Sequence, residues 1–195
     1  MSFRRFNNKL GFTLIELLVV IAIIGLLATI VYASLKNARE KGKVANAGGT
    51  ARNMTIAVEL YFSDMGFYPP DTNRGWDPGF MQPLPFNPDT GDSTIPSCDH
   101  CPPDWTTIVQ QKWNGPYLGS WPSVTPWNGK YDFNYWPLGT TRYGCTIPPG
   151  IYIGVQADYE DENAIPNYAE QLMVNQGFDA DKCINGESQI QLYSL

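Results

Sequence analysis

Histidine is nearly absent from this chain of 195 residues, in which His100 is the only one. This excludes metal sites that need a pair of histidines. A Ser-His-Asp catalytic triad would have to use His100. Paired carboxylates such as Asp158 and Asp161 could serve a hydrolase, but no catalytic motif accompanies them. The sequence therefore predicts a protein that is not an enzyme.

Proline is missing from residues 1–68, and all 16 prolines lie at Pro69 or beyond it. Because proline breaks helices, the first third of the chain can form a long helix and most of the rest cannot. Charge is divided at nearly the same place: residues 1–52 carry a net charge of +6 and residues 53–195 a net charge of −12. The acidic second part argues against a nucleic-acid partner, because phosphate binding needs a positive surface.

Charge is also scarce within residues 12–32, an apolar run of 21 residues in which Glu16 is the only charged side chain. As a helix this run would be about 31 Å long, which matches the hydrocarbon core of a membrane. A basic leader with Arg4, Arg5 and Lys9 precedes it, as expected of a segment that stays in the cytoplasm. A cleaved secretory signal peptide is the alternative, but the run is longer than usual and no convincing processing site follows it. We therefore expect a transmembrane helix.

The basic leader, Gly11, the sequence FTLIE at residues 12–16 and the long apolar run together resemble a known processing signature. Over residues 4–35 they are similar to type IV prepilins and type II secretion pseudopilins. The resemblance implies that a membrane peptidase removes the leader, residues 1–11, by cutting between Gly11 and Phe12. Phe12 would then be N-methylated, and residues 12–33 would serve as the transmembrane and polymerisation helix.

The same resemblance implies a structural subunit that spans the inner membrane once, with its head outside the cytoplasm, and then joins an extracellular or periplasmic filament. Its partners would be the prepilin peptidase and methyltransferase, the inner-membrane assembly machinery, the lipid bilayer before assembly, and copies of itself or related pilins. Pilus, secretion pseudopilus and DNA-uptake filament remain open. An uncleaved, membrane-tethered binding module with an aromatic, acidic head is the alternative.

Glu16 would be the assembly residue in this interpretation. Assembly would bury the new ammonium group of Phe12, and a buried charge needs a partner. Glu16 of one subunit could neutralise Phe12 of its neighbour. The alternative is a tolerated carboxylate that reaches toward the lipid headgroups.

A second pattern occupies residues 34–66, where apolar residues recur every three or four positions. This stripe consists of Val44, Ala47, Ala51, Met54, Val58, Tyr61 and Met65. It predicts that a nearly continuous helix runs from Thr13 to Met65 and ends at Gly66. We expect the stripe to pack on the protein's own sheet, with a coiled-coil seam or a partner-binding surface as the alternative. The glycines at 25, 42, 48 and 49 are weak points of this helix.

The remaining residues, 67–195, predict a loop-rich globular head. Residues 67–126 are rich in proline, glycine and aspartate and too interrupted for long elements. Asn128 and Gly129 predict a hairpin turn, and the alternation within residues 131–135, 151–155 and 190–192 predicts three strands. The fold class is therefore α+β, a pilin-like long helix packed on a small antiparallel sheet.

A weaker, local resemblance to the major pseudopilin of type II secretion covers residues 115–118 (GPYL), Trp121 with Pro122, and residues 126–129 (PWNG). The chain departs from that pattern at Thr125 and at Asn128 with Gly129.

A structural calcium site is a further implication of the resemblance, because major pseudopilins bind calcium near the position of Asp158, Glu160 and Asp161. Oxygen-rich clusters suit Ca²⁺. This run lacks the spacing of an EF-hand, and a solvated acidic loop is the alternative. No other cofactor is expected.

All four cysteines lie in the acidic part of the chain, and an even number suits disulfides outside the cytoplasm. Cys98 and Cys101 have the C-x-x-C spacing of zinc ligands or redox centres, but no second C-x-x-C follows. We favour bridges between Cys98 and Cys101 and between Cys145 and Cys183. The other pairings, bound zinc and free thiols are the alternatives.

Overall fold

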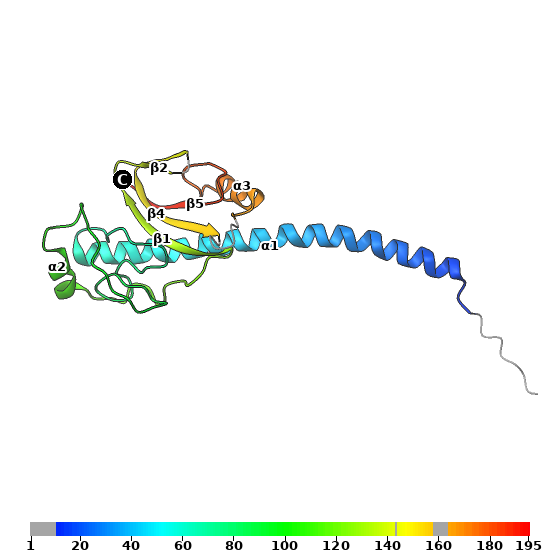
Figure 1. The fold of residues 1–195 in the computed structure, drawn as a ribbon, viewed down its shortest axis with the longest axis horizontal. Helices are drawn as coiled ribbons and strands as arrows, with labels where there is room; N and C mark the ends of the chain where they lie inside the picture. Colours follow the sequence, from blue (N-terminus) through cyan, green and yellow to red (C-terminus); the bar gives the residue numbers. More distant parts are fainter. Residues whose placement is uncertain (1–10, 143, 158–163) are drawn as a thin grey trace, which may run out of the picture. The chain divides into compact units, whose positions relative to one another are not determined.

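The structure, a computed structural model, describes residues 11–142, 144–157 and 164–195. It begins with helix α1 (Leu14–Met65), within which the chain divides into an N-terminal unit that ends at Arg39 and a head formed by Glu40–Leu195. The remaining elements belong to the head (Figure 1). They are α2 (Trp105–Lys112), β1 (Asn128–Trp136), β2 (Thr140–Arg142), β3 (Cys145–Ile147), β4 (Gly150–Ala157), α3 (Asn167–Asn175) and β5 (Ser188–Ser194).

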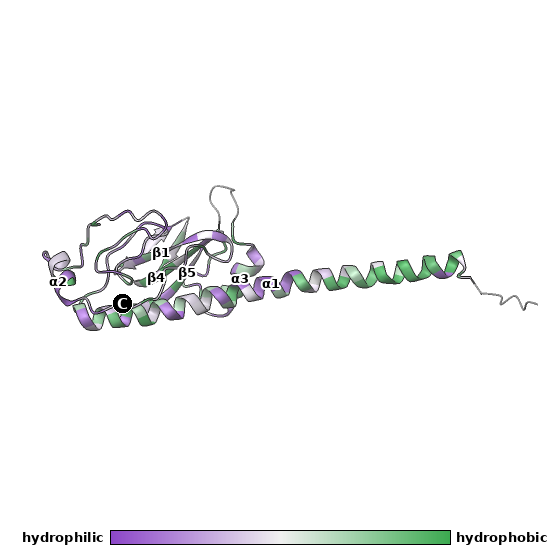
Figure 2. Ribbon diagram, turned by 90° about the horizontal axis from the view of Figure 1, so that it is seen from below, coloured by the Kyte–Doolittle hydropathy of each residue, from purple (hydrophilic) through white to green (hydrophobic). Residues whose placement is uncertain are grey.

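The N-terminal unit is a single helical segment whose apolar side chains are exposed. α1 begins one residue after the predicted start and is helical through all four glycines. Ile15 is 70% exposed and Leu26 is 66% exposed, and Figure 2 shows this stretch of α1 as almost entirely hydrophobic. It has the length and composition of a membrane span. An apolar surface of this size that its own unit leaves uncovered calls for lipid or another protein.

In the head, the second part of α1 supplies the apolar stripe that the sequence predicts. All seven positions of the stripe are buried, none of them more than 4% exposed. They share one core with inward-facing residues of the sheet, among them Tyr131, Phe133, Ile153 and Ile190. The helix ends at Met65 and is followed by Gly66, whose φ of 80° suits glycine and whose N–H donates to the Phe62 carbonyl at 2.8 Å. Packing on the protein's own sheet is thereby confirmed.

The sheet has three antiparallel strands in the order β1-β4-β5. These strands contain the three alternating segments identified in the sequence, so the α+β class is confirmed. A separate two-stranded hairpin, β2 with β3, precedes β4 along the chain. Sequence reasoning missed this hairpin and both short helices, α2 and α3.

The predicted hairpin turn at Asn128 and Gly129 is wrong, because both residues open β1, in which Asn128 pairs with Ala157 of β4. A tight turn precedes them: the N–H of Asn128 donates to the Thr125 carbonyl at 3.0 Å, and the N–H of Thr125 donates to the Gly129 carbonyl at 2.8 Å. The register shifts between Asn128 and Tyr131, as in a β-bulge. A Cβ atom at Gly129 would lie 2.2 Å from the Gln156 carbonyl oxygen, so the bulge requires glycine here.

The polar residues of β1 are buried as well as its apolar ones: Asp132 and Asn134 are only 3% and 4% exposed. Asp132 lies opposite Gly154 in β4. A Cβ atom on that glycine would lie 1.8 Å from an Asp132 carboxylate oxygen, so glycine makes the room for the buried carboxylate. Burial raises the pKa of Asp132. Both faces of this sheet are therefore covered.

Buried Asp77 orders the loop-rich segment that follows α1. Its carboxylate accepts the backbone N–H groups of Gly79, Phe80 and Met81 at 3.0–3.3 Å. Its own backbone exchanges two hydrogen bonds with Phe86. Burial raises the pKa of Asp77 to about 6 against the opposing effect of these three donors. The hydrogen bonds to this one carboxylate thus fix the conformation of a loop that has no regular secondary structure.

Two disulfides, Cys98–Cys101 and Cys145–Cys183, join the cysteines in the pairing that we favoured from the sequence. In the loop-entropy account the bond between residues 38 positions apart stabilises the head by about 4 kcal/mol, and the bond across 3 positions by about 2 kcal/mol. The larger stabilisation is that of Cys145–Cys183, which ties β3 to the segment before β5.

The acidic residues of the calcium prediction, Asp158, Glu160 and Asp161, lie outside the described residues.

A buried carboxyl group, that of Asp179, lies between α3 and β5. Asp179 is 2% exposed, and one of its carboxylate oxygens accepts the N–H of Gln189 at 3.2 Å. Burial, with added repulsion from Asp181 and Glu170, raises the pKa of Asp179 to about 8. A carboxyl group whose pKa is raised by folding contributes stability that is complete below its unfolded pKa and is lost as the pH rises through the folded value.

We therefore expect the melting temperature of the head to fall between pH 5 and pH 9, partly through Asp179. Asp179→Asn keeps an oxygen for the Gln189 N–H and removes the charge, so it should flatten this dependence and raise the melting temperature at pH 9. Thermal melts followed by circular dichroism test this. The exposed Asp92→Asn serves as the control, and equal slopes for all three proteins would contradict the assignment.

Two adjacent glycines of α1 make a matched pair for a packing test. A Cβ atom at Gly48 would lie 2.7 Å from the Phe178 ring, whereas no described atom lies within 4 Å of one at Gly49. Gly49→Ala should raise the free energy of unfolding by about 0.5–1 kcal/mol through helix propensity. Gly48→Ala should not raise the free energy of unfolding in this way, because the new methyl group would have to displace the Phe178 ring. Urea unfolding of both variants measures the difference, and equal stabilisation would refute the close packing.

Candidate functional site: the N-terminal processing and assembly segment

The predicted cleavage point lies in a non-helical stretch just ahead of α1. Gly11, Phe12 and Thr13 have no regular secondary structure, and Phe12 is 89% exposed. No described atom lies within 4 Å of the place that a Cβ atom on Gly11 would occupy. Packing within the described chain therefore gives no reason for a glycine at position 11. A glycine here is instead consistent with recognition by a peptidase. An exposed, non-helical peptide is also the form that a peptidase can bind.

Thr13 and Glu16 close the start of α1 with a reciprocal set of hydrogen bonds. The Thr13 backbone N–H and hydroxyl both donate to Glu16 Oε2 at 2.8 Å. The Glu16 N–H donates to Thr13 Oγ1 at 3.3 Å. This is a capping box, which satisfies N–H groups that a helix start would otherwise leave without partners. Sequence reasoning assigned Glu16 to assembly and missed this local role, although the spacing T-x-x-E is the signal for it.

The capping box uses only one oxygen of Glu16. Among the described residues, Oε1 of Glu16 has no hydrogen-bond partner. The bonds to Thr13 involve atoms C-terminal to the Gly11–Phe12 peptide bond, so cutting that bond would leave them intact. Glu16 can therefore keep its cap and still offer an anionic oxygen to a cation.

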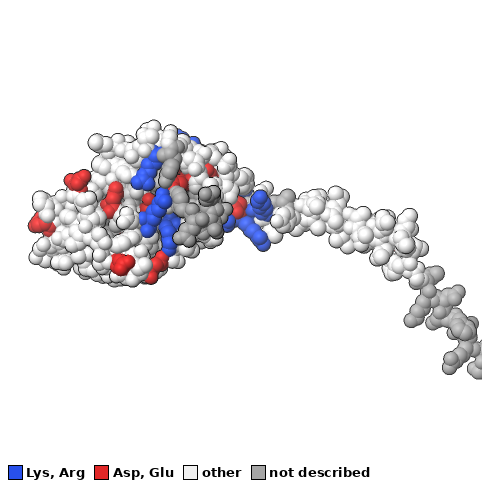
Figure 3. Space-filling view, in the orientation of Figure 1, with Lys and Arg blue, Asp and Glu red and all other residues white. Residues whose placement is uncertain are grey.

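Within the apolar run, Glu16 has no charged neighbour along the sequence. It is the only Lys, Arg, Asp or Glu in residues 12–35. On the face shown in Figure 3, the described start of α1 is uncharged, and basic side chains appear only beyond the apolar stretch. A carboxylate in such a setting is costly in hydrocarbon and marks a functional position.

Comparison with known proteins identifies the same segment. Residues 6–32 match the family model described as the prokaryotic N-terminal methylation motif. The chain is 43% identical over 61 residues to fimbrial protein EcpC of Eikenella corrodens, covering 31% of this chain and 40% of that protein. It is 33% identical over 89 residues to type II secretion system core protein G of Pseudomonas aeruginosa, covering 43% and 62%. It is 38% identical over 61 residues to type IV major pilin protein PilE of Neisseria gonorrhoeae, covering 31% and 36%.

The N-terminal segment of the chain is thus similar to that of the type IV pilin and pseudopilin family. Members of this family are structural proteins and not enzymes, which agrees with the prediction from the sequence. The alignments span between about a third and two thirds of the length of these relatives. No solved structure matches the chain.

The head residues that resemble a major pseudopilin hold the loops of the head against α1. The Tyr117 hydroxyl donates to Asp64 Oδ2 at 2.7 Å, near the C-terminal end of the helix. Trp127 Nε1 donates to Glu40 Oε2 at 2.9 Å, where the head begins, and Lys43 pairs with the same carboxylate at 3.1 Å. These residues of the pilin-like head thus have a structural role along the helix.

Closely spaced metal ligands occur in two groups among the described residues, and both contain a disulfide. Cys98, Cys101 and His100 form one group, and Cys145, Cys183 and Asp181 form the other. Because the sulfur atoms are bonded to each other, no thiolate is available to a metal ion in either group. The zinc alternative for the C-x-x-C pair therefore does not apply to this oxidised state.

Proposed function

We propose that the chain is a filament subunit that is cut between Gly11 and Phe12, N-methylated on Phe12 and assembled through residues 12–33. The observation that carries the proposal is an exposed apolar helix with one carboxylate, Glu16, four positions after Phe12. The matching methylation motif supports it. Because the relatives include a fimbrial protein, a pilin and a secretion core protein, we propose a filament subunit without choosing among these filaments.

The role of Glu16 follows from the change in surroundings on assembly. In a membrane the start of the helix lies near headgroups and water, where a carboxylate and an ammonium group are both solvated. In a filament the same groups would be packed among apolar helices, where an unpaired charge is strongly unfavourable. The free Oε1 of Glu16 in one subunit and the Phe12 ammonium group of the next would neutralise each other. This pair would also fix the axial register of adjacent helices.

The proposed location is the inner membrane, crossed once, with the head outside the cytoplasm before assembly. The apolar segment supports the crossing, and two disulfides in the head suit an oxidising compartment. The prepilin peptidase and methyltransferase, the membrane assembly machinery and related pilins are the proposed partners. Calcium binding at Asp158, Glu160 and Asp161 stays a prediction.

Cleavage distinguishes this function from the alternative, an uncleaved membrane tether. In cells that contain a prepilin peptidase, we expect the mature chain to begin at Phe12 and to carry one additional methyl group. Intact-mass spectrometry of the purified protein measures both changes. Gly11→Val is the matched variant and should keep the leader. A wild-type chain that retains residues 1–11 in such cells would favour the tether.

Assembly tests the role of Glu16. Glu16→Ala should insert and be cleaved normally but form little filament, because the buried Phe12 ammonium group would lack its partner. Leaving a buried charge unpaired costs about 3–5 kcal/mol, equivalent to at least a hundredfold weaker association per contact. Sheared filaments quantified by immunoblot and electron microscopy give the measurement.

Glu59→Ala, which removes an exposed carboxylate from the head portion of α1, is the control and should assemble normally. Abundant filaments of the Glu16→Ala protein would contradict the neutralising pair. Absence of cleavage in that variant would instead assign Glu16 to peptidase recognition.

A further inference from the structure

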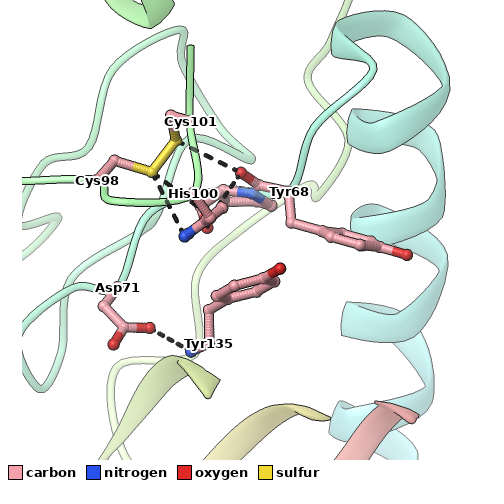
Figure 4. Close-up of a disulfide and its surroundings, with 7 residues drawn as sticks. Tyr68, Asp71, Cys98, His100, Cys101 and Tyr135 are labelled. Atoms are coloured by element: carbon pink, nitrogen blue, oxygen red, sulfur yellow. Dashed lines mark hydrogen bonds between the residues drawn. A yellow bond between two sulfur atoms is a disulfide. The ribbon is translucent and has the colours of Figure 1, made fainter. Parts of the chain in front are cut away.

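The only histidine of the chain lies against one of its two disulfides (Figure 4). Cys98 Sγ is 3.6 Å from His100 Nδ1 and 3.5 Å from Nε2. The ring stacks on Tyr135 with a centroid separation of 3.7 Å. Nε2 lies 3.2 Å and 3.1 Å from the carbonyl oxygens of Tyr68 and Pro69, so an N–H at this position donates to them and leaves Nδ1 free to take up a proton.

The two sulfur atoms of this disulfide have different surroundings. Cys98 lines an open pocket of about 310 Å³, together with Asp71, Asp99, His100 and Tyr135, whereas Cys101 does not line it. Cys101 Sγ lies 3.9 Å from the Tyr68 carbonyl oxygen. A thiol at Cys101 could donate to that oxygen, while a thiolate there would be repelled by it. A thiolate at Cys98 would instead lie beside an imidazole.

The second disulfide provides an internal comparison. Cys145 is 7% exposed, and the acidic Asp181 lies close to both Cys145 and Cys183. A carboxylate disfavours a neighbouring thiolate, and burial blocks an attacking thiol. Cys145–Cys183 also closes a far longer loop than Cys98–Cys101. The surroundings of Cys145–Cys183 thus suit a structural bond, and those of Cys98–Cys101 suit reaction.

We propose that Cys98–Cys101 is a thiol–disulfide exchange site, with Cys98 as the reactive sulfur, Cys101 as the resolving sulfur and His100 as the residue that stabilises the Cys98 thiolate. The class of substrate is an exposed dithiol, or a disulfide in the reverse direction. This inference goes beyond filament assembly and does not depend on it.

The exchange proceeds in two balanced steps. One thiolate of a dithiol attacks Cys98 Sγ through the pocket, and the bond between Cys98 and Cys101 breaks. Its electron pair stays on Cys101, which takes up a proton and donates it to the Tyr68 carbonyl. The second thiolate of the dithiol then attacks the first substrate sulfur, which is now bonded to Cys98 Sγ in a mixed disulfide. Cys98 leaves as a thiolate beside His100, the dithiol is oxidised to a disulfide and the protein pair is reduced.

The electrostatics around His100 permit this role. Burial lowers the pKa of His100, while the carbonyls of Tyr68 and Pro69 and the charge of Asp99 act in the opposite direction. The groups that face it are Asp71 and Asp99 from the loops and Tyr68 and Tyr135 from the aromatic side. A Cys98 thiolate would add a negative charge at its ring and favour the imidazolium form, as in thiolate–imidazolium pairs.

Two matched variants of the full-length chain, purified in detergent, test the proposal. Cys101→Ser leaves Cys98 as a free thiol, and Cys98→Ser leaves Cys101. With 5,5′-dithiobis(2-nitrobenzoic acid) at pH 6, we expect Cys98 to react at least about tenfold faster than Cys101, because the thiolate is the reactive form. Adding His100→Phe, which keeps a ring to stack on Tyr135, should remove this advantage. Adding Asp92→Asn, at an exposed position outside the pocket lining, should not.

Equal rates for the two thiols, or an unchanged Cys98 rate in the His100→Phe protein, would overturn the proposal. A second measurement uses the unmodified protein and so does not depend on the folding of the variants. Timed reduction by dithiothreitol, followed by alkylation and mass spectrometry, should open Cys98–Cys101 while Cys145–Cys183 stays closed. Simultaneous reduction of both bonds would equally overturn it.

Discussion

The structure depends on one constraint: an apolar helical surface cannot remain in water. α1 meets this constraint differently in its two parts. In the head, the stripe from Val44 to Met65 is buried against the sheet of the same chain. In the N-terminal unit, the apolar side chains are exposed on the helix, so that lipid or other chains must cover them. Folding alone thus completes the head, whereas the N-terminal unit requires a membrane or a filament.

The periodicity of the sequence was enough to predict the helix and the strands because burial on one face leaves a regular trace. The spacing of three and four in residues 44–65 and the alternation in 131–135 both report a single apolar partner surface. The same reasoning failed where burial has no period. Asp132 and Asn134 look like solvent-facing strand residues, but both are buried. Nothing in a single strand's pattern reveals that burial.

Short elements and turns were the other failure, again for a physical reason. α2 and α3 have only 8 and 9 residues, too few for a helical period to stand out among nearby prolines and glycines. Asn128 and Gly129 have the residue types of a hairpin turn, yet tertiary pairing with β4 places them in a bulge. The order of the loop around Asp77 comes from one buried carboxylate. Its partners are backbone N–H groups, which no side-chain pattern records.

The candidate site was predictable in position but not in mechanism. The residues from Gly11 to Glu16 were identified from the sequence, whereas the capping box appears only when the hydrogen bonds are seen. That cap bears on why a carboxylate occupies this particular position. The N-terminus of a helix carries a partial positive charge, and cleavage would add a full ammonium charge one residue before the cap. Glu16, in the first turn, can offset both with its two oxygens, one held by Thr13 and one directed outward. Water can stabilise the ammonium group while the helix end is solvated, whereas in the proposed filament an anion from a neighbouring subunit would take the place of that water.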